Sequence, residues 1–192
     1  MTQAVDEVLR AIDTLPRTGR PGIVAIDGRC ASGKTTLAGL LARRRSCTVF
    51  HMDDYFLRPE QRTRERLAEP GGNVDHERFA EEVLIPLHSG AGTVTVRAYD
   101  CKTQSLDDPV TAPAGGAVIV EGSYSCHPAL WDYADLHVFL TVSPEEQMRR
   151  IVRRNGVDGA AVFRDRWIPL EEAYFRAFGI EERCDLRFST EE

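Results

Sequence analysis

The sequence has no apolar run long enough to cross a bilayer and no pair of closely spaced cysteines. Its five cysteines are scattered, odd in number and without a C-x-x-C pair. These absences argue against a membrane span, a disulfide framework and a zinc framework, and they fit a reducing compartment. Residues 5–13 are charged and amphipathic, which is not the layout of a signal peptide. We therefore expect a cytoplasmic protein without a membrane partner.

Positive charge is also scarce, because 24 lysines and arginines face 30 aspartates and glutamates, which gives a formal net charge of −6. Broad nucleic-acid binding needs a basic face, so we expect no nucleic-acid partner. The N-K-x-D and D-x-x-G motifs of GTPases are absent as well, which argues against a GTP-driven switch. The chain of 192 residues, 42% of them hydrophobic, suits one globular domain with a sizeable core.

The most informative motif is Gly28–Thr35, which reads G-R-C-A-S-G-K-T and directly follows the apolar residues 23–27. It matches the Walker A pattern, in which glycines let backbone N–H groups wrap a phosphate chain. Helical apolar spacing over residues 34–44 places a helix N-terminus at the same phosphates. Lys34 would reach the β- and γ-phosphates, and the Thr35 hydroxyl would hold Mg²⁺.

The alternative for this motif is a glycine- and serine-rich surface loop that matches by accident. The strand before the loop and the helix after it argue against that interpretation. We assign nucleotide binding to the motif and the residue after it, namely Gly28, Arg29, Cys30, Ala31, Ser32, Gly33, Lys34, Thr35 and Thr36.

Apolar stretches alternate with amphipathic ones along the rest of the chain. The predicted strands cover residues 23–27, 47–52, 117–120, 136–142 and 185–188. The predicted helices cover residues 4–14, 34–44, 77–87, 143 to about 154, and about 160–178, the last with a kink at Pro169. Because strands alternate with helices, we predict an α/β, P-loop NTPase fold: a parallel five-stranded sheet with helices on both faces.

We expect a single domain over residues 1–192, in which residues 1–21 form an N-terminal helix and a connector. About 93–113 alternates apolar and polar residues and predicts a small hairpin insertion for the substrate. Residues 57–73 have no periodicity and predict a mobile surface segment. About 149–166 would form a short lid.

Two acidic residues follow predicted strands, at the edge of the sheet where ligands bind in such folds. Asp53 is the candidate general base, because a kinase needs a carboxylate close to the acceptor hydroxyl. Asp54 competes for that role, and one of the two carboxylates could instead only cap a turn. Tyr55 and Phe56 would form an apolar wall for the acceptor or pack beneath the loop. Glu121 ends an apolar strand and would orient Mg²⁺ together with Thr35, unless it is a partly exposed strand end.

Four arginines, Arg149, Arg150, Arg153 and Arg154, share one predicted helix with spacings of three and four residues. A charged run of this kind is more often a solvated face. Beside a phosphate loop, however, arginines can close over a triphosphate and neutralise the transferred phosphoryl group. We therefore assign catalytic roles to Arg150 and Arg153.

These segments together resemble the uridine kinase and phosphoribulokinase branch of P-loop kinases from about residue 22 to 188, and uridine–cytidine kinases most closely. H-M-D-D-Y-F is similar to the family's D-x-F-Y segment, which implies that Asp53 is the catalytic aspartate. N-V-D-H resembles the family's N-F-D-H, which implies that Asp75 contacts the nucleoside sugar. R-A-Y-D resembles the V-Y-D of the substrate hairpin and implies that Tyr99 lies beside the base. V-E-G is similar to the family's F-E-G, and R-R-I-V-R is similar to the start of its lid.

The sequence also departs from the family pattern. Gln104 stands where the hairpin histidine reads the pyrimidine, although a glutamine amide can still hydrogen-bond a base edge. The lid lacks the family's E-R-G-R and keeps only N-G at residues 155–156. The residues assigned to the substrate are Asp53, Tyr55, Asp75, Tyr99, Gln104 and Arg150. Asp185 is assigned to the nucleotide site.

The leading hypothesis is an ATP- and Mg²⁺-dependent kinase that phosphorylates a small metabolite, with a nucleoside 5′-hydroxyl as its acceptor. One alternative is a kinase for a pantothenate-like acid or a sugar phosphate, for which Arg58, Arg62, Arg64 and Arg66 could supply positive charge. Another is a non-catalytic ATP-binding regulatory module. The N-terminal helix could pack on the domain or on a second subunit, so a homo-oligomer stays open.

Overall fold

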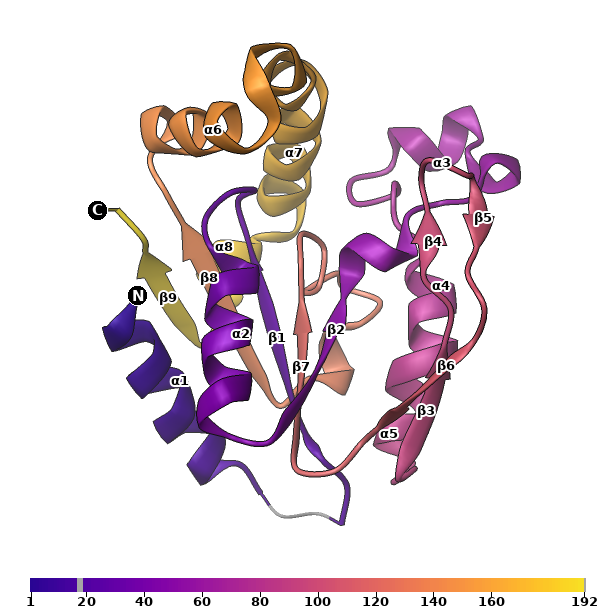
Figure 1. Cartoon of the computed structure of the whole chain (residues 1–192), viewed down its shortest axis with the longest axis vertical. Coiled ribbons are helices and arrows are strands. Elements are labelled where there is room, and N and C mark those ends of the chain that lie inside the picture. Colours follow the sequence, from indigo (N-terminus) through magenta and orange to yellow (C-terminus); the bar gives the residue numbers. More distant parts are fainter. Residues whose placement is uncertain (17–18, 192) are drawn as a thin grey trace.

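The computed structural model describes residues 1–16 and 19–191. Its centre is a five-stranded sheet in the order β2-β7-β1-β8-β9, with every neighbouring pair parallel (Figure 1). The strands are β1 (Gly22–Gly28), β2 (Cys47–His51), β7 (Ala117–Glu121), β8 (Leu136–Thr141) and β9 (Leu186–Ser189). The predicted P-loop NTPase sheet is confirmed.

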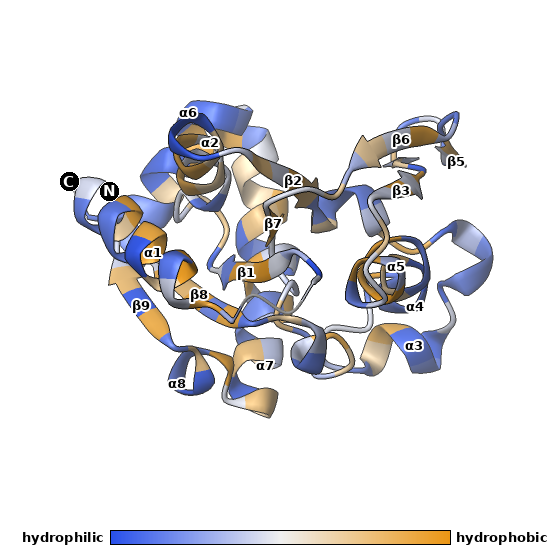
Figure 2. Cartoon of the chain, turned by 90° about the horizontal axis from the view of Figure 1, so that it is seen from below, coloured by the Kyte–Doolittle hydropathy of each residue, from blue (hydrophilic) through white to orange (hydrophobic). Residues whose placement is uncertain are grey.

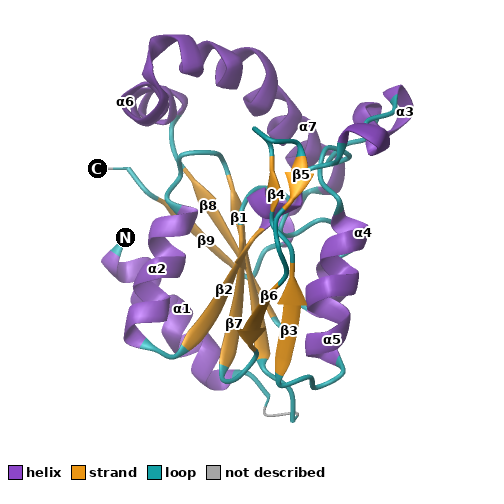
Figure 3. Ribbon diagram, turned by 45° about the vertical axis from the view of Figure 1, so that its right-hand side comes forward, coloured by secondary structure: helices purple, strands orange, loops and turns teal. Residues whose placement is uncertain are grey.

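Helices cover both faces of this sheet (Figure 3). On one face lie α1 (Thr2–Thr14) and α2 (Lys34–Arg44). On the other lie α4 (His76–Phe79), the π-helical turn η3 (Ala80–Leu84) and α5 (Ile85–His88), together with α7 (Ile168–Phe178) and α8 (Ile180–Arg183). Within the described residues, no helix combines the length and the apolar character that a membrane span requires.

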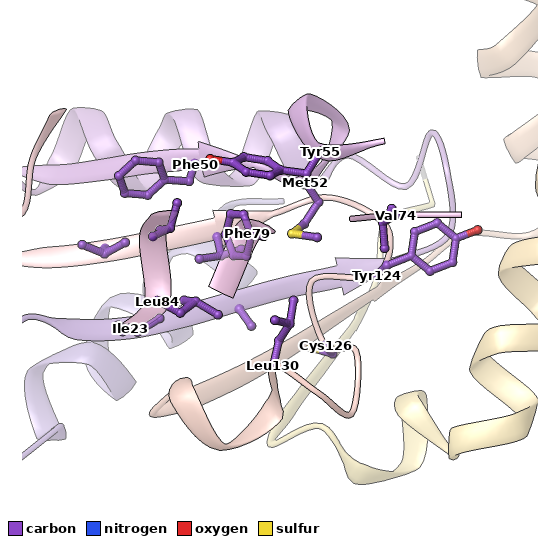
Figure 4. Close-up of a cluster of buried hydrophobic side chains, with 14 of the residues drawn as sticks. Ile23, Phe50, Met52, Tyr55, Val74, Phe79, Leu84, Tyr124, Cys126 and Leu130 are labelled. Carbon is purple, nitrogen blue, oxygen red and sulfur yellow. The ribbon is translucent and has the colours of Figure 1, made fainter. Parts of the chain in front are cut away.

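The three central strands, β1, β7 and β8, are mostly apolar because both of their faces are buried. In β1, Ile23 and Ala25 join one hydrophobic core, while Val24 and Ile26 join the other. Figure 4 shows the first core, where Phe79 packs near Met52 and Tyr55. Figure 2 shows hydrophobic residues along the central strands and hydrophilic ones along α3 (Arg64–Ala68) and much of α6 (Pro144–Val162).

Residues 57–73 contain more regular structure than the sequence predicted. The 3-10 turn η2 (Pro59–Gln61) is followed by α3. The Arg66 guanidinium stabilises the segment by donating to Gly72 O and Val74 O, both at 2.9 Å, and by pairing with Glu77. These elements are too short to produce a detectable hydrophobic period, and long-range side-chain contacts stabilise them.

Residues 93–113 form an antiparallel arm beside α4 and α5 (Figure 3). Its base pairs β3 (Thr93–Val96) with β6 (Val110–Pro113), and its tip pairs β4 (Tyr99–Asp100) with β5 (Ser105–Leu106). Two 3-10 turns complete the fold, η1 (Met52–Tyr55) after β2 and η4 (Trp131–Tyr133) before β8.

Helices α6 and α7 rise above the carboxyl ends of the strands (Figure 1). Helix α6 is broken at Gly156, whose φ of 73° and ψ of 175° are open to glycine and not to other residues. A π-helical turn, η5 (Phe163–Trp167), joins α6 to α7, and Pro169 lies at the start of α7, directly after this turn. The predicted lid segment therefore folds as two helical arms separated by a bend.

Candidate functional site

Three neighbouring strands bring the predicted chemistry to one edge of the sheet. Gly28 ends β1, Glu121 ends β7, and Asp53 follows β2 in η1. A cavity of about 770 Å³ lies at this edge, and the phosphate loop, Asp53, Glu121 and the two arms of the lid line it. The parallel order β2-β7-β1 explains this convergence, since parallel strands present their carboxyl ends on the same side.

Gly28 lets the backbone of the phosphate loop begin in direct contact with β8. Its φ is 135°, and a Cβ at this position would lie 2.0 Å from the carbonyl oxygen of Leu140. Any other residue would push the loop away from β8, so the first glycine of the motif is required by a close approach as well as by conformation.

Asp27 holds the loop from beneath. This fully buried carboxylate accepts hydrogen bonds from the N–H groups of Gly28 (2.7 Å), Tyr124 (3.2 Å) and Cys126 (3.0 Å), and from the Tyr174 hydroxyl (2.9 Å). Burial raises the pKa of Asp27 to about 6, although these hydrogen bonds and the nearby Lys34 ammonium oppose the rise. One side chain thereby joins the phosphate loop, the loop after β7, and α7.

Lys34 lies inside the curve of the phosphate loop. Its Nζ donates to the carbonyl oxygens of Gly28 (2.6 Å) and Arg29 (3.1 Å) and lies 3.3 Å from Ser123 Oγ. The Arg29 side chain turns away from the loop and pairs with Glu172 and Glu181, at 2.7 and 3.0 Å. The ammonium is therefore the cation that this loop presents to an anion.

Thr35 and Glu121 lie together, as a magnesium site requires. The Thr35 hydroxyl lies 3.1 and 3.2 Å from the two carboxylate oxygens of Glu121, which is buried and also contacts His51 Nδ1. Mg²⁺ prefers oxygen ligands and takes one or two carboxylates together with substrate phosphates. A hydroxyl and a carboxylate side by side at the foot of the phosphate loop therefore fit this ion.

Of the two carboxylates after β2, Asp53 is the one that lines the cavity. The surrounding protein desolvates Asp53 and raises its pKa above the usual 3.8, while Lys34 opposes this rise and Glu121 adds to it. The pKa of Asp54 is also raised by burial. The backbone carbonyl of Asp54 accepts a 3.0 Å hydrogen bond from Arg78. Asp53 is therefore the better placed of the two for an acceptor.

The lid arginines differ in their surroundings. Arg150 is held by Glu146 and by the carbonyl oxygens of Ala31 and Thr190. Hydrogen bonds from Arg149 and Arg150 lower the pKa of Glu146 to about 2.

Further along the helix, Arg153 and Arg154 are exposed, and both line the cavity. The Arg154 guanidinium lies 5.4 Å from the centre of the Phe163 ring. Arg150 is thus fixed beside the loop, and the pair before Gly156 lies on the open side of the cavity.

Four residues predicted to bind the acceptor lie elsewhere. Among the residues that the structure describes, the lining of the cavity leaves out Tyr55, Asp75, Tyr99 and Gln104. Tyr55 is buried, and its hydroxyl donates to Glu82 at 2.9 Å. Gln104 is exposed at the tip of the arm, with a φ of 56°. Their roles in substrate binding stay predictions.

Asp75 and Tyr99 are both engaged by protein groups. Asp75 caps α4 by accepting from the Arg78 N–H at 3.1 Å, and its other oxygen accepts from Gln61 Nε2 at 2.8 Å. The Tyr99 hydroxyl accepts a 3.0 Å hydrogen bond from Arg62.

Asp185 lies at the opposite edge of the sheet from the phosphate loop. It precedes β9, and its carboxylate accepts a 2.8 Å hydrogen bond from the N–H of His137, near the start of β8. The structure does not bring this residue to the cavity that the other predicted nucleotide-binding residues surround.

The cavity lining also contains Ser123, Trp167 and Glu171, which no sequence pattern selects. Asn73 lines it too and is the first residue of N-V-D-H, whose aspartate lies outside the lining. Glu171 is buried within α7, and only the fold shows that this helix returns to the phosphate loop. Phe56 also lines the cavity. Its role as a wall for the acceptor stays a prediction.

Comparison with known proteins gives a consistent picture of the fold. Residues 24–161 match the family model described as AAA domain. The chain is similar in structure to a possible uridine kinase from Bacillus stearothermophilus, with a TM-score of 0.71 and 20% identity over 97% of this chain and 98% of that one. It is also similar to a protein named as a fructose transport system kinase from Silicibacter sp. TM1040, with a TM-score of 0.68 and 19% identity over 96% and 98% of the two chains.

The relatives found by sequence are longer, bifunctional proteins. A bifunctional pantoate ligase/cytidylate kinase from Prochlorococcus marinus (strain MIT 9313) is 28% identical over 167 residues, which are 73% of this chain and 33% of that protein. A bifunctional alpha-galactosidase/sucrose kinase from Mediterraneibacter gnavus is 30% identical over 164 residues, 72% of this chain and 17% of that protein. The chain thus spans a third or less of the length of these two relatives.

Proposed function

The chain belongs to the AAA-domain family and has the P-loop kinase fold that its sequence predicted, and from this premise we propose that it transfers the terminal phosphoryl group of ATP to a hydroxyl group of a small metabolite. The observation that carries the proposal is the shared cavity. Asp53 and the phosphate loop line the same cavity, and the Lys34 ammonium lies close enough to Asp53 to oppose the rise of its pKa. A switch or sensor has no need of a carboxylate at that place.

The residues would divide the work as follows. The loop N–H groups and Lys34 would hold the phosphates. Arg150 and Arg153, together with Arg154 beside them in the cavity lining, would neutralise charge on the transferred group. Asp53 would accept the proton of the acceptor hydroxyl as the new bond to phosphorus forms. Thr35 and Glu121 would hold Mg²⁺, which when bound neutralises charge on the phosphate oxygens.

The finer proposal is a nucleoside 5′-hydroxyl as the acceptor, by analogy with uridine kinases. The resemblance of five sequence segments supports it, together with the likeness in fold. The positions of Asp75, Tyr99 and Gln104 outside the cavity lining do not add to it.

A panel of acceptors tests the proposal. Release of ADP is measured with uridine, cytidine, ribose, ribose 5-phosphate and pantothenate, in the wild-type protein, Asp53→Asn and Asp54→Asn. We expect at least one acceptor to stimulate ADP release. Asp53→Asn should lower kcat by about 10³-fold, since general base catalysis contributes about 10² to 10⁴, whereas Asp54→Asn should lower it less than about tenfold.

Two outcomes would change this proposal, the first by overturning the function and the second by overturning only the role of Asp53. Background ADP release with every acceptor would favour a regulatory ATP-binding module. Full activity of Asp53→Asn together with loss in Asp54→Asn would move the base to the neighbouring carboxylate.

A further inference from the structure

The cavity beside the phosphate loop has two ends. Met1 and Thr190 line it next to Ser32 and Gly33. The Thr190 hydroxyl donates to Ser32 O at 2.7 Å, and a Cβ on Gly33 would lie 3.0 Å from the Met1 side chain. We name the part of the cavity that contains Asp53 the acceptor end.

The acceptor end is defined by Asp53, Phe56, Asn73, Trp167 and Glu171, all of which line the cavity. The ring centres of Phe56 and Trp167 are 6.0 Å apart at an angle of 36°. Two rings this close leave no room for a third ring between them, so they form one apolar wall. Glu171 follows Trp167 by four residues, which places both side chains on one side of the helix.

Glu171 is an unusual member of this set, because it is only 5% exposed. One of its carboxylate oxygens accepts the Cys30 N–H of the phosphate loop at 2.9 Å, and the other accepts the Ser123 hydroxyl at 2.7 Å. A carboxylate has about four lone-pair sites, so this group is held in place and still has acceptor capacity toward the cavity.

When a nucleotide is bound, negative charge exceeds positive charge at the acceptor end. Lys34, His51 and Arg154 are groups whose charges act on Asp53. His51 pairs with Glu121. A triphosphate on the phosphate loop would occupy Lys34 and the three arginines of α6 that line the cavity. The acceptor would then meet the carboxylates of Asp53 and Glu171 without a cation of its own.

Arginines on the neighbouring segment do not restore the balance. Arg62 donates to Leu57 O and the Tyr99 hydroxyl, and Arg66 pairs with Glu77. Arg78 donates to the backbone oxygens of Asp54 and Arg97. Within residues 19–191, the cavity lining contains none of these three guanidinium groups.

We propose that Glu171 selects the acceptor by charge, so that the site takes alcohols without a phosphate or carboxylate group. The acceptor lays an apolar face on Phe56 and Trp167 and donates a second hydroxyl group to Glu171, while its reacting hydroxyl faces Asp53. An acceptor with a negative group at this end would meet a buried carboxylate that protein donors hold in place. This inference rests on the proposed kinase function and narrows its substrate class.

The test uses two pairs of acceptors that differ in charge, pantothenol with pantothenate and ribose with ribose 5-phosphate. For each pair, kcat/KM is measured by ADP release in the wild type, Glu171→Gln, Glu171→Asp and Glu172→Gln. Glu172 is the matched control, because it is the next acid on the same helix and pairs with Arg29 outside the cavity lining.

We expect the wild type to favour the uncharged member by about tenfold or more. Glu171→Gln should reduce that preference about tenfold, mainly through a lower KM for the charged member. Glu171→Asp keeps the charge and should keep the preference, even if the weaker contact with the loop lowers both activities. Glu172→Gln should leave the preference within about twofold.

A wild-type preference for the charged members, or an unchanged preference in Glu171→Gln, would overturn the inference while leaving the kinase function intact. If no acceptor stimulates ADP release, the kinase function fails instead. In that case, calorimetry measures the Kd of each acceptor for the protein loaded with a non-hydrolysable ATP analogue, and the ratio of Kd values within a pair gives the selectivity. Tighter binding of the uncharged members, lost in Glu171→Gln, would support the inference, and any other binding result would overturn it.

Discussion

The phosphate loop and the acceptor side of the cavity use their side chains in different ways. In the loop, backbone geometry defines the site: Gly28 lies against β8, and Lys34 curls back onto loop carbonyls. On the acceptor side, contacts between distant segments define it, as when Glu171 of α7 accepts from the Cys30 N–H and the Ser123 hydroxyl. The first arrangement depends on a continuous motif, and the second depends on tertiary contacts. Substitutions of groups that touch the phosphates or the acceptor should therefore damage chemistry, and substitutions of groups that only join distant segments should damage stability.

The largest effect should come from Lys34→Met. This change removes the loop cation, and loss of one preorganised charge-stabilising group costs about 10²- to 10³-fold in kcat. We expect kcat to fall about 10³-fold while thermal unfolding changes little, as measured by ADP release and by circular dichroism. Arg43→Met, on the same helix but in its last turn, is the control. A fall of less than tenfold would remove the loop lysine from the mechanism.

Asp27 lies beneath the loop and should connect its geometry to pH. Its folded-state pKa of about 6 exceeds the ordinary value of 3.8, so the folded protein holds this proton more tightly than the unfolded chain does. The bound proton adds to the free energy of unfolding at pH values below 3.8, and this contribution is lost as the pH rises through about 6. At 1.36 kcal/mol per pKa unit, the contribution is about 3 kcal/mol.

Asp27→Asn lacks this titration, so it isolates the effect. The wild-type free energy of unfolding minus that of the variant should decrease by about 2 kcal/mol between pH 4 and pH 7, because part of the change falls below pH 4. Urea unfolding at several pH values measures it, with the exposed Asp132→Asn as the control. A difference that stays constant over this range would show that the hydrogen bonds to Asp27 cancel its desolvation.

Glu121→Gln should affect the metal requirement. The amide keeps the size of the side chain but removes the charge beside Thr35, so we expect the Mg²⁺ concentration for half-maximal activity to rise about 10- to 100-fold. Titration of activity with MgCl₂ measures it, and Glu145→Gln, exposed in the first turn of α6, is the control. An unchanged Mg²⁺ requirement would remove Glu121 from the metal site.

The smallest effect should come from Asp75→Ala, outside the cavity lining. Loss of a helix N-cap costs about 0.5 to 2 kcal/mol, and the Gln61 contact is lost as well. We expect the free energy of unfolding to fall by about 2 kcal/mol, with the acceptor KM changed less than about threefold. A large rise in KM without loss of stability would instead support the role in substrate binding that the sequence resemblance implies.

The difference between the two regions also explains which features the sequence could predict. The phosphate loop, the strand before it and the acids at strand ends are local patterns, so the sequence alone places Gly28, Asp53 and Glu121 at one edge of the sheet. Glu171 could not be found in this way, because its partner Cys30 is 141 residues away along the chain. Asp75 could be recognised from N-V-D-H, but its engagement by Gln61 depends on a short turn that has no sequence period.

The bend at Gly156 has a consequence for how this protein could change over time. A single glycine separates the two arms of α6, and its backbone conformation is closed to other residues. Replacement there would redirect everything that follows up to Trp167, including one wall of the acceptor end, without touching the loop that binds phosphate. A substitution of Gly156 alone could therefore change which acceptors bind, while the phosphate loop keeps its capacity to bind the phosphate donor.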